Sequence, residues 1–140
     1  MIDIDHFKRI NDSFGHAQGD EVLKTIALCL DRNKPSSAML ARIGGEEFVI
    51  LLPGLNEQGS LLVCEHLRLE VSRLVTGSFR TLTMSVGLTL FDKGEDLADT
   101  LRRADRALYD AKRGGRDRCR VAANQVPPER FPRLELVANG

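Results

Sequence analysis

The chain has 140 residues, and its balance of 42% hydrophobic and 29% charged residues is typical of one soluble globular domain. Twenty Lys and Arg offset twenty Asp and Glu, which excludes the strong positive charge that attracts a nucleic-acid polymer or an anionic membrane. No run approaches the roughly 20 apolar residues of a membrane span, and the acidic start is unlike a secretory signal. The widely spaced Cys29, Cys64 and Cys119 form no CxxC pair, so we expect free thiols in a cytoplasmic protein.

The first part of the chain predicts a strand followed by two helices. Ile2 and Asp3 are typical of the end of a strand that turns into a helix. That helix has an apolar face at Phe7, Ile10 and Phe14. Residues 15–19 are expected to interrupt the helix, and Asp20 is expected to cap a second one. The buried stripe of the second helix would consist of Val22, Leu23, Ile26, Ala27 and Leu30.

A hairpin is predicted next, because the apolar runs 38–43 and 48–52 are joined through Gly44 and Gly45. Glycine tolerates positive φ and lets a phosphate or another backbone approach closely. Two adjacent carboxylates follow, and strand pleating sends them to opposite faces. One could therefore face a ligand. This segment alone fits an ordinary polar hairpin tip as well as it fits a metal-nucleotide site.

The second half of the chain predicts a helix, a strand, a helix and an edge strand. Apolar residues recur at helical spacing from Val63 to Leu74 and from Leu97 to Ala111. Residues 82–90 alternate between large apolar and small side chains, which predicts a strand with one buried face and one face covered by small groups. Residues 118–122 are compatible with an edge strand.

The alternation of strands and helices favours an α/β sandwich, a sheet with helices on both sides. Residues 1–122 are assigned to this domain. Residues 123–140 contain three prolines within six positions, and we expect a tail outside the core.

The segment from Arg42 to Phe48 resembles the signature of the GGDEF domain, the diguanylate cyclases, in a GGEEF form. Further blocks resemble the family in order and spacing from Asp3 to about Arg118. These blocks are Asp3–Asp12, Gly15-His16, Gly19-Asp20, Ser85-Val86-Gly87, Ala104–Lys112 and Gly115-Arg116.

The resemblance implies a five-stranded, mostly antiparallel sheet flanked by helices, akin to nucleotidyl cyclase and polymerase palm domains. Family members have a longer apolar first strand, preceded by a helix. Their absence here leads us to expect a chain that begins inside its domain or a truncated one, with an N-terminal sensor domain missing from it.

The resemblance also implies an enzyme, a diguanylate cyclase that condenses two GTP into cyclic di-GMP and two pyrophosphates in a homodimer. Such chemistry uses Mg²⁺, or alternatively Mn²⁺, to neutralise the phosphates and activate the 3′-hydroxyl. Asp3, the carbonyl of Ile4 and Glu46 would hold the metal by resemblance. Glu46 or Glu47 would assist deprotonation, and Glu46 matches the proton acceptor of the family.

The resemblance also implies which residues contact the substrate. Asn11 and Asp20 match the guanine-binding positions, with His16 in the pocket wall, although helix capping and loop hydrogen bonding would also explain such residues. The residues expected to contact the phosphates are Lys112, Arg116, Lys8, the backbone near Phe7, and the glycines Gly44 and Gly45. Other arginines, at positions 102, 103, 106 and 113, are expected to form a solvated face.

Two further expectations limit the function. The Arg-x-x-Asp product-inhibition motif of many family members is replaced by Pro35 and Ala38, which predicts no feedback inhibition there. The alternative to a cyclase is a non-catalytic GTP-binding or protein-interaction module derived from a GGDEF domain. Another nucleotidyl cyclase is a weaker alternative, because Asn11 and Asp20 favour guanine over adenine.

Overall fold

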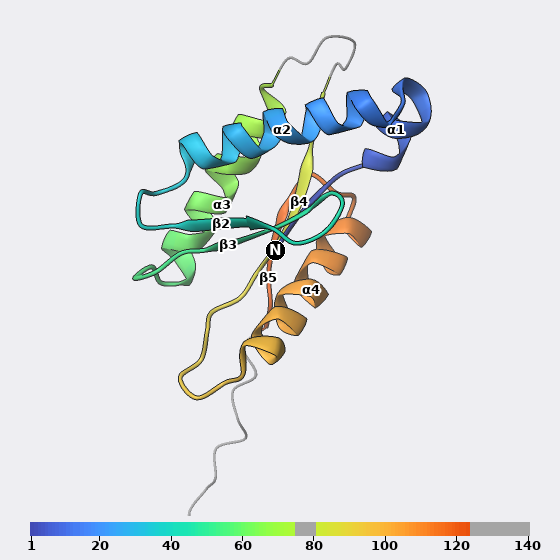
Figure 1. Cartoon of the computed structure of the whole chain (residues 1–140). Coiled ribbons are helices and arrows are strands. Elements are labelled where there is room, and N and C mark those ends of the chain that lie inside the picture. Colours follow the sequence, from blue (N-terminus) through green and yellow to red (C-terminus); the bar gives the residue numbers. More distant parts are fainter. Residues whose placement is uncertain (75–80, 124–140) are drawn as a thin grey trace, which may run out of the picture.

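The computed structural model describes residues 1–74 and 81–123, which form a layered α+β domain (Figure 1). Its sheet has five strands in the order β2-β3-β1-β4-β5. The strands are β1 (Ile2–Ile4), β2 (Met39–Arg42), β3 (Glu47–Leu51), β4 (Met84–Leu88) and β5 (Cys119–Val121). The helices are α1 (Phe7–Phe14), α2 (His16–Asn33), α3 (Glu57–Ser72) and α4 (Leu97–Arg113). The predicted α/β sandwich is confirmed.

The sheet is mixed, and mostly antiparallel as expected. Strand β1 runs antiparallel to both β3 and β4, and β2 and β3 form the predicted antiparallel hairpin. Only β4 and β5 are parallel, because α4 carries the chain across the sheet between them, as a parallel connection requires. The short β1 therefore occupies the centre of the sheet, with a neighbour on each side.

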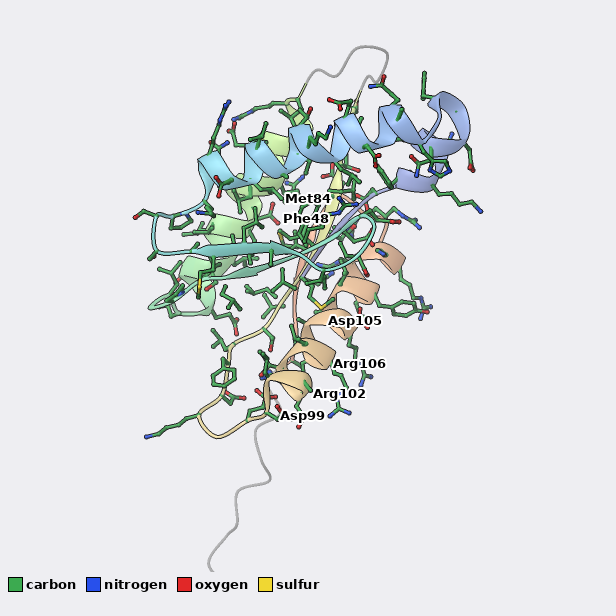
Figure 2. The ribbon with its side chains drawn as sticks, in the orientation of Figure 1. Phe48, Met84, Asp99, Arg102, Asp105 and Arg106 are labelled. Atoms are coloured by element: carbon green, nitrogen blue, oxygen red, sulfur yellow. The ribbon has the colours of Figure 1, made fainter. Side chains whose placement is uncertain are left out.

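One face of the sheet packs against α2 and α3. Ile2 and Ile4 share a core cluster with apolar residues of both helices. Phe48 of β3 and Met84 of β4 lie in the same interior, under α2 (Figure 2). Because side chains alternate along a strand, Asp3 between these isoleucines faces the other side of the sheet.

Helix α4 covers that other side. A side chain at Gly87 of β4 would collide with the carbonyl oxygen of Ala104 and with Leu108, so the glycine permits the helix to lie directly on the strand. All five residues of β4 are buried. The prediction of a face covered by small groups is thus confirmed, and α4 is what covers it.

The first helical region differs from the prediction at residues 15–19. Helix α2 begins at His16, and Gly15, with φ 84°, is the only residue between the two helices. Asp20 lies inside α2 and does not cap it. Helix α2 continues through Gly19 because this glycine packs against Asn11 of α1, where a larger side chain would clash.

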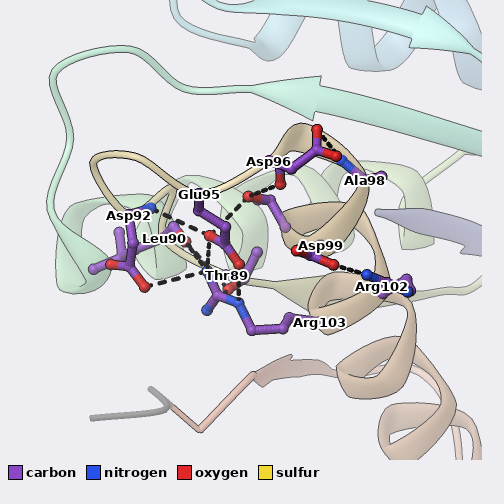
Figure 3. Close-up of polar contacts among 10 residues, drawn as sticks. Thr89, Leu90, Asp92, Glu95, Asp96, Ala98, Asp99, Arg102 and Arg103 are labelled. Carbon is purple, nitrogen blue, oxygen red and sulfur yellow. Dashed lines mark hydrogen bonds and ion pairs between the residues drawn. The ribbon is translucent and has the colours of Figure 1, made fainter. Parts of the chain in front are cut away.

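The outward face of α4 carries Asp99, Arg102, Asp105 and Arg106 (Figure 2). Arg102 pairs with Asp99 and is exposed, as expected for a solvated face. Arg103 contradicts that expectation. It is largely buried, and it donates hydrogen bonds to Thr89 Oγ1, the Leu90 carbonyl and Glu95, so that it ties down the loop between β4 and α4 (Figure 3). The Arg103 guanidinium lowers the pKa of Glu95 to about 2.

The remaining expectations concern the thiols, membranes and the tail. Cys29, Cys64 and Cys119 are buried and free, as predicted. Among the described residues, no helix is long and apolar enough to cross a membrane. The predicted tail lies outside the described residues except at its first position, residue 123.

Candidate active site

The central strand places Asp3 between two neighbouring strands. In the register of the sheet, Asp3 is the direct partner of Glu47 on β3 and of Ser85 on β4. Directly paired residues point their side chains to the same face. Glu47 therefore shares the α4 face with Asp3. Glu46 lies in the bend just before β3, which begins at Glu47, so the pleat of the strand does not set the direction of its side chain.

Lys112, in the last turn of α4, reaches the carboxylate of Asp3. Its Nζ lies 2.7 Å from Asp3 Oδ2, and the Asp3 side chain is only 9% exposed. A carboxylate this deeply buried requires a partner, and the lysine supplies the compensating charge. Two residues predicted from separate motifs, one for the metal and one for phosphate, thus meet at one point.

The hairpin tip is a tight, hydrogen-bonded turn. Arg42 Nε donates to the carbonyl oxygens of Gly44 and Gly45, at 3.1 and 3.0 Å. The Glu47 carboxylate folds back over Gly44, where a Cβ would lie 2.6 Å from Glu47 Oε2. Glycine at this position therefore leaves room for the carboxylate. On the other side, the Glu46 carbonyl accepts a hydrogen bond from the Ile4 amide at 3.2 Å.

The junction of α1 and α2 contains an unpaired acceptor. Asn11 Oδ1 is buried and has no hydrogen-bond partner among the described residues. It lies against Gly19 and near Phe7 of the buried face of α1. The first turns of α2 carry the exposed His16 and Asp20. A buried hydrogen-bond acceptor without a donor is uncommon in folded proteins, and one explanation is that a bound group supplies the donor.

The phosphate-contact candidates are spread over three elements. Lys8 is exposed on α1, beside the buried Phe7. Helix α4 ends at Arg113, so Arg116 lies beyond the helix, in a turn where its φ is 64°. The four-residue spacing from Lys112 to Arg116 predicts that both point the same way from a helix end, and this prediction is wrong because Arg116 does not belong to the helix.

That turn is anchored to a residue whose role was not foreseen. The amide of Asp117 donates to Asp5 Oδ2 at 3.0 Å, and Thr83 and Ser85 donate their hydroxyls to the same carboxylate. Asp5 belongs to the motif block that begins at Asp3, but nothing in the sequence indicated a partner 112 positions away.

The donor set suits a hard cation shared with a ligand. In residues 1–74 and 81–123, no three acidic, histidine or cysteine side chains converge as they would in an all-protein metal cage. Mg²⁺ is usually held by one or two carboxylates together with phosphates and water. Asp3 with a neighbouring glutamate and a backbone carbonyl fits that type of site.

The fold and the site together define a palm-like α+β domain with an acidic central strand beside a glycine hairpin. The family model described as diguanylate cyclase, GGDEF domain, matches residues 1–118, and the chain belongs to this family.

Curated relatives agree with this family. The chain is 46% identical over 125 residues to diguanylate cyclase DgcP of Pseudomonas aeruginosa, which covers 87% of this chain and 19% of the relative. It is 37% identical over 131 residues to diguanylate cyclase A of Treponema denticola, with 91% and 35% covered. The chain thus spans between a fifth and about a third of the length of these relatives.

Solved structures agree on the fold. The active GGEEF domain of a diguanylate cyclase from Vibrio cholerae has a TM-score of 0.80 and 37% identity, covering 86% of this chain and 79% of that one. Diguanylate cyclase SiaD of Pseudomonas aeruginosa, solved with its activator SiaC, has a TM-score of 0.82 and 42% identity, covering 86% and 48%. The GGDEF domain of DgcB from Caulobacter crescentus, in complex with c-di-GMP, has a TM-score of 0.80 and 38% identity, covering 86% and 74%.

Proposed function

We propose that this domain condenses two molecules of GTP into cyclic di-GMP and releases two pyrophosphates. The observation that carries the proposal is the ion pair of Asp3 with Lys112, on a strand whose register pairs Asp3 with Glu47 of the GGEEF hairpin, in a chain of the GGDEF family. The reaction joins two nucleotides, so two domains that each present one GTP must meet, and a homodimer is part of the proposal.

The metal site of the proposal uses Asp3, the carbonyl of Ile4 and Glu46, with Glu47 close by on the Asp3 face. A bound Mg²⁺, or Mn²⁺, would neutralise phosphate charge and lower the pKa of the attacking 3′-hydroxyl. Lys112 neutralises Asp3, and the triphosphate would offer this ammonium a second anionic partner.

Selection of guanine rests on Asn11 and Asp20. Guanine presents N1–H and N2–H donors on one edge, whereas adenine presents an acceptor at N1. The unpaired Asn11 Oδ1 could accept from a base N–H, and together with the Asp20 carboxylate it would offer two acceptors to the N1–H and N2–H donors of guanine. Asp20 and His16, both exposed at the start of α2, would complete the pocket wall, while Gly44, Gly45, Lys8, Arg116 and the backbone at Phe7 would lie along the phosphates.

The proton of the 3′-hydroxyl would be accepted by Glu46 or Glu47. The family position favours Glu46, and the sheet register supports Glu47 as the neighbour of Asp3. Replacing each glutamate separately by glutamine distinguishes them, because the proton acceptor loses turnover while a positioning residue keeps part of it. A cytoplasmic location and control by a separate sensor domain stay predictions.

The test is chromatographic detection of cyclic di-GMP after the purified chain is incubated with GTP and Mg²⁺, with its molecular mass measured alongside. We expect product from a dimer, and loss of turnover by at least about a hundredfold in Glu46→Gln. Glu57→Gln, at the start of α3, is the matched control. A folded dimer that binds GTP but forms no product would favour the non-catalytic module instead.

A further inference from the structure

Asp5 is a buried carboxylate whose bonding is complete without any cation. It is 5% exposed and directly follows β1. Its Oδ1 accepts from Ser85 Oγ at 2.7 Å, and its Oδ2 accepts from Thr83 Oγ1 at 2.8 Å and from the Asp117 amide at 3.0 Å. Burying a carboxylate costs free energy that hydrogen bonds must offset. The three donors provide that compensation, and one of them belongs to a distant turn.

The turn that Asp5 holds has an unusual backbone. Arg116 and Asp117 are consecutive residues in the left-handed region, with φ 64° and 44°. Residues other than glycine adopt this conformation reluctantly, so it persists where surrounding contacts impose it. Asp117 has two such contacts. Its amide donates a hydrogen bond to Asp5 Oδ2, and its carboxylate accepts one from Arg68 Nη1 of α3 at 2.7 Å.

These contacts leave the backbone of Arg116 little freedom. Its amide donates to the Ala111 carbonyl at 3.1 Å, and its carbonyl accepts from Arg118 Nε at 2.9 Å. The residue itself is exposed. A guanidinium that projects from a fixed backbone loses less conformational entropy on binding an anion than one on a mobile loop.

We propose that Asp5 is a positioning residue that, through the Asp117 amide, fixes the left-handed turn presenting Arg116 to the triphosphate of GTP. The end of β1 then orients two of the three cations proposed for the site, Lys112 and Arg116. Asp3 contacts Lys112 directly, and Asp5 acts on Arg116 through the turn. The inference rests on the proposed function, because the phosphate contact of Arg116 belongs to that proposal.

The test is a double-mutant cycle read by calorimetric binding of a non-hydrolysable GTP analogue with Mg²⁺. Asp5→Ala and Arg116→Ala should each weaken binding about tenfold, the loss expected for one misplaced or missing charged contact. The double variant should bind no more weakly than Arg116→Ala alone. If the two losses multiply, Asp5 acts on nucleotide binding by a route other than Arg116, and the proposal is overturned.

Asp5→Asn separates positioning from general stabilisation. Its amide oxygen can accept from the Asp117 amide while its NH₂ group donates to the Ser85 hydroxyl. We therefore expect it to restore binding to within about threefold of the wild type. Arg113→Ala is the matched control, since this exposed arginine lies over the Tyr109 ring, 5.8 Å from its centroid, and should bind the analogue unchanged.

Amide hydrogen exchange of the nucleotide-free protein tests the turn independently of GTP. Exchange at residues 116 and 117 should accelerate in Asp5→Ala while β3 and β4 stay protected. Unchanged exchange at residues 116 and 117 would overturn only the positioning role of Asp5. A wild-type chain that binds no GTP analogue would overturn the proposed function together with the triphosphate contact of Arg116. If Asp5→Ala does not fold, Arg68→Met releases the same turn from α3, and losses that multiply with Arg116→Ala would again refute the proposal.

Discussion

The two ends of β1 are built differently. At its C-terminal end, Asp3 and Asp5 are buried, and each carboxylate has polar partners from other elements. At its N-terminal end, the Met1 ammonium donates to the Gly87 carbonyl at 2.7 Å, and burial lowers the pKa of this amino group.

An apolar cavity of about 490 Å³ lies beside Met1. It is lined by residues of β3 and β4, and by α3 and α4 from the two faces of the sheet, among them Leu52, Cys64, Leu90 and Leu101. Close packing favours stability, and a cavity forfeits contacts. The comparison shows that this strand of three residues is packed against polar partners at the end that carries the candidate chemistry, whereas an apolar cavity borders its other end.

The largest expected effect is at the packed end. Asp3→Asn removes a proposed metal ligand and leaves Lys112 without its anionic partner. We expect cyclic di-GMP formation to fall at least about a hundredfold, measured by chromatography. Asp31→Asn, at an exposed carboxylate of α2 that pairs with Lys34, is the control and should keep full activity. Retained turnover in Asp3→Asn would show that the packed end is structural only.

The next effect concerns the contact of α4 with β4 at Gly87, beside the N-terminal end of β1. Gly87→Ala would drive a methyl group into the backbone of α4. We expect a loss of about 2 kcal/mol or more in the free energy of unfolding, measured by urea denaturation. Gly45→Ala, where an added Cβ meets nothing within 4 Å, should leave stability nearly unchanged. Equal stability of both variants would mean that α4 does not rest on β4.

A third experiment probes the cavity beside the N-terminal end of β1 through Cys64, which lines it. Burial raises the pKa of its thiol to about 11, and also raises the pKa of Cys119. A raised pKa keeps a thiol protonated and unreactive below that value. At pH 8 we therefore expect labelling by a thiol reagent at least about tenfold slower than in the unfolded chain. Rapid labelling of Cys64 would indicate that the cavity opens to solvent.

The smallest expected effect is an absence of binding, away from both ends of β1. The turn between α2 and β2 contains Pro35 and the buried Ala38, whose amide donates to the Pro35 carbonyl at 2.9 Å. Neither side chain can pair with a guanine or a phosphate. Calorimetry with cyclic di-GMP should detect no tight site there. Micromolar binding that survives Arg116→Ala would contradict this prediction.

Much of the fold was predictable because its signals are local. The period of the apolar residues identified α3, α4 and β4, and the glycine pair identified the β2–β3 hairpin. The junction of α1 and α2 was misjudged, since glycine at position 19 suggested a break. Its real role is to let α2 pack against Asn11, a contact between residues that no local pattern relates.

The sequence by itself determined the family motifs, the order of the elements and the residue types available to a nucleotide site. Only the tertiary structure decided which groups meet. The register of β1 made Glu47 the neighbour of Asp3, the end of α4 brought Lys112 onto that carboxylate, and the turn after α4 came to rest on Asp5. Motif residues are recognisable one at a time, but strand register and helix placement depend on the packing of the whole core, which joins positions far apart in the chain.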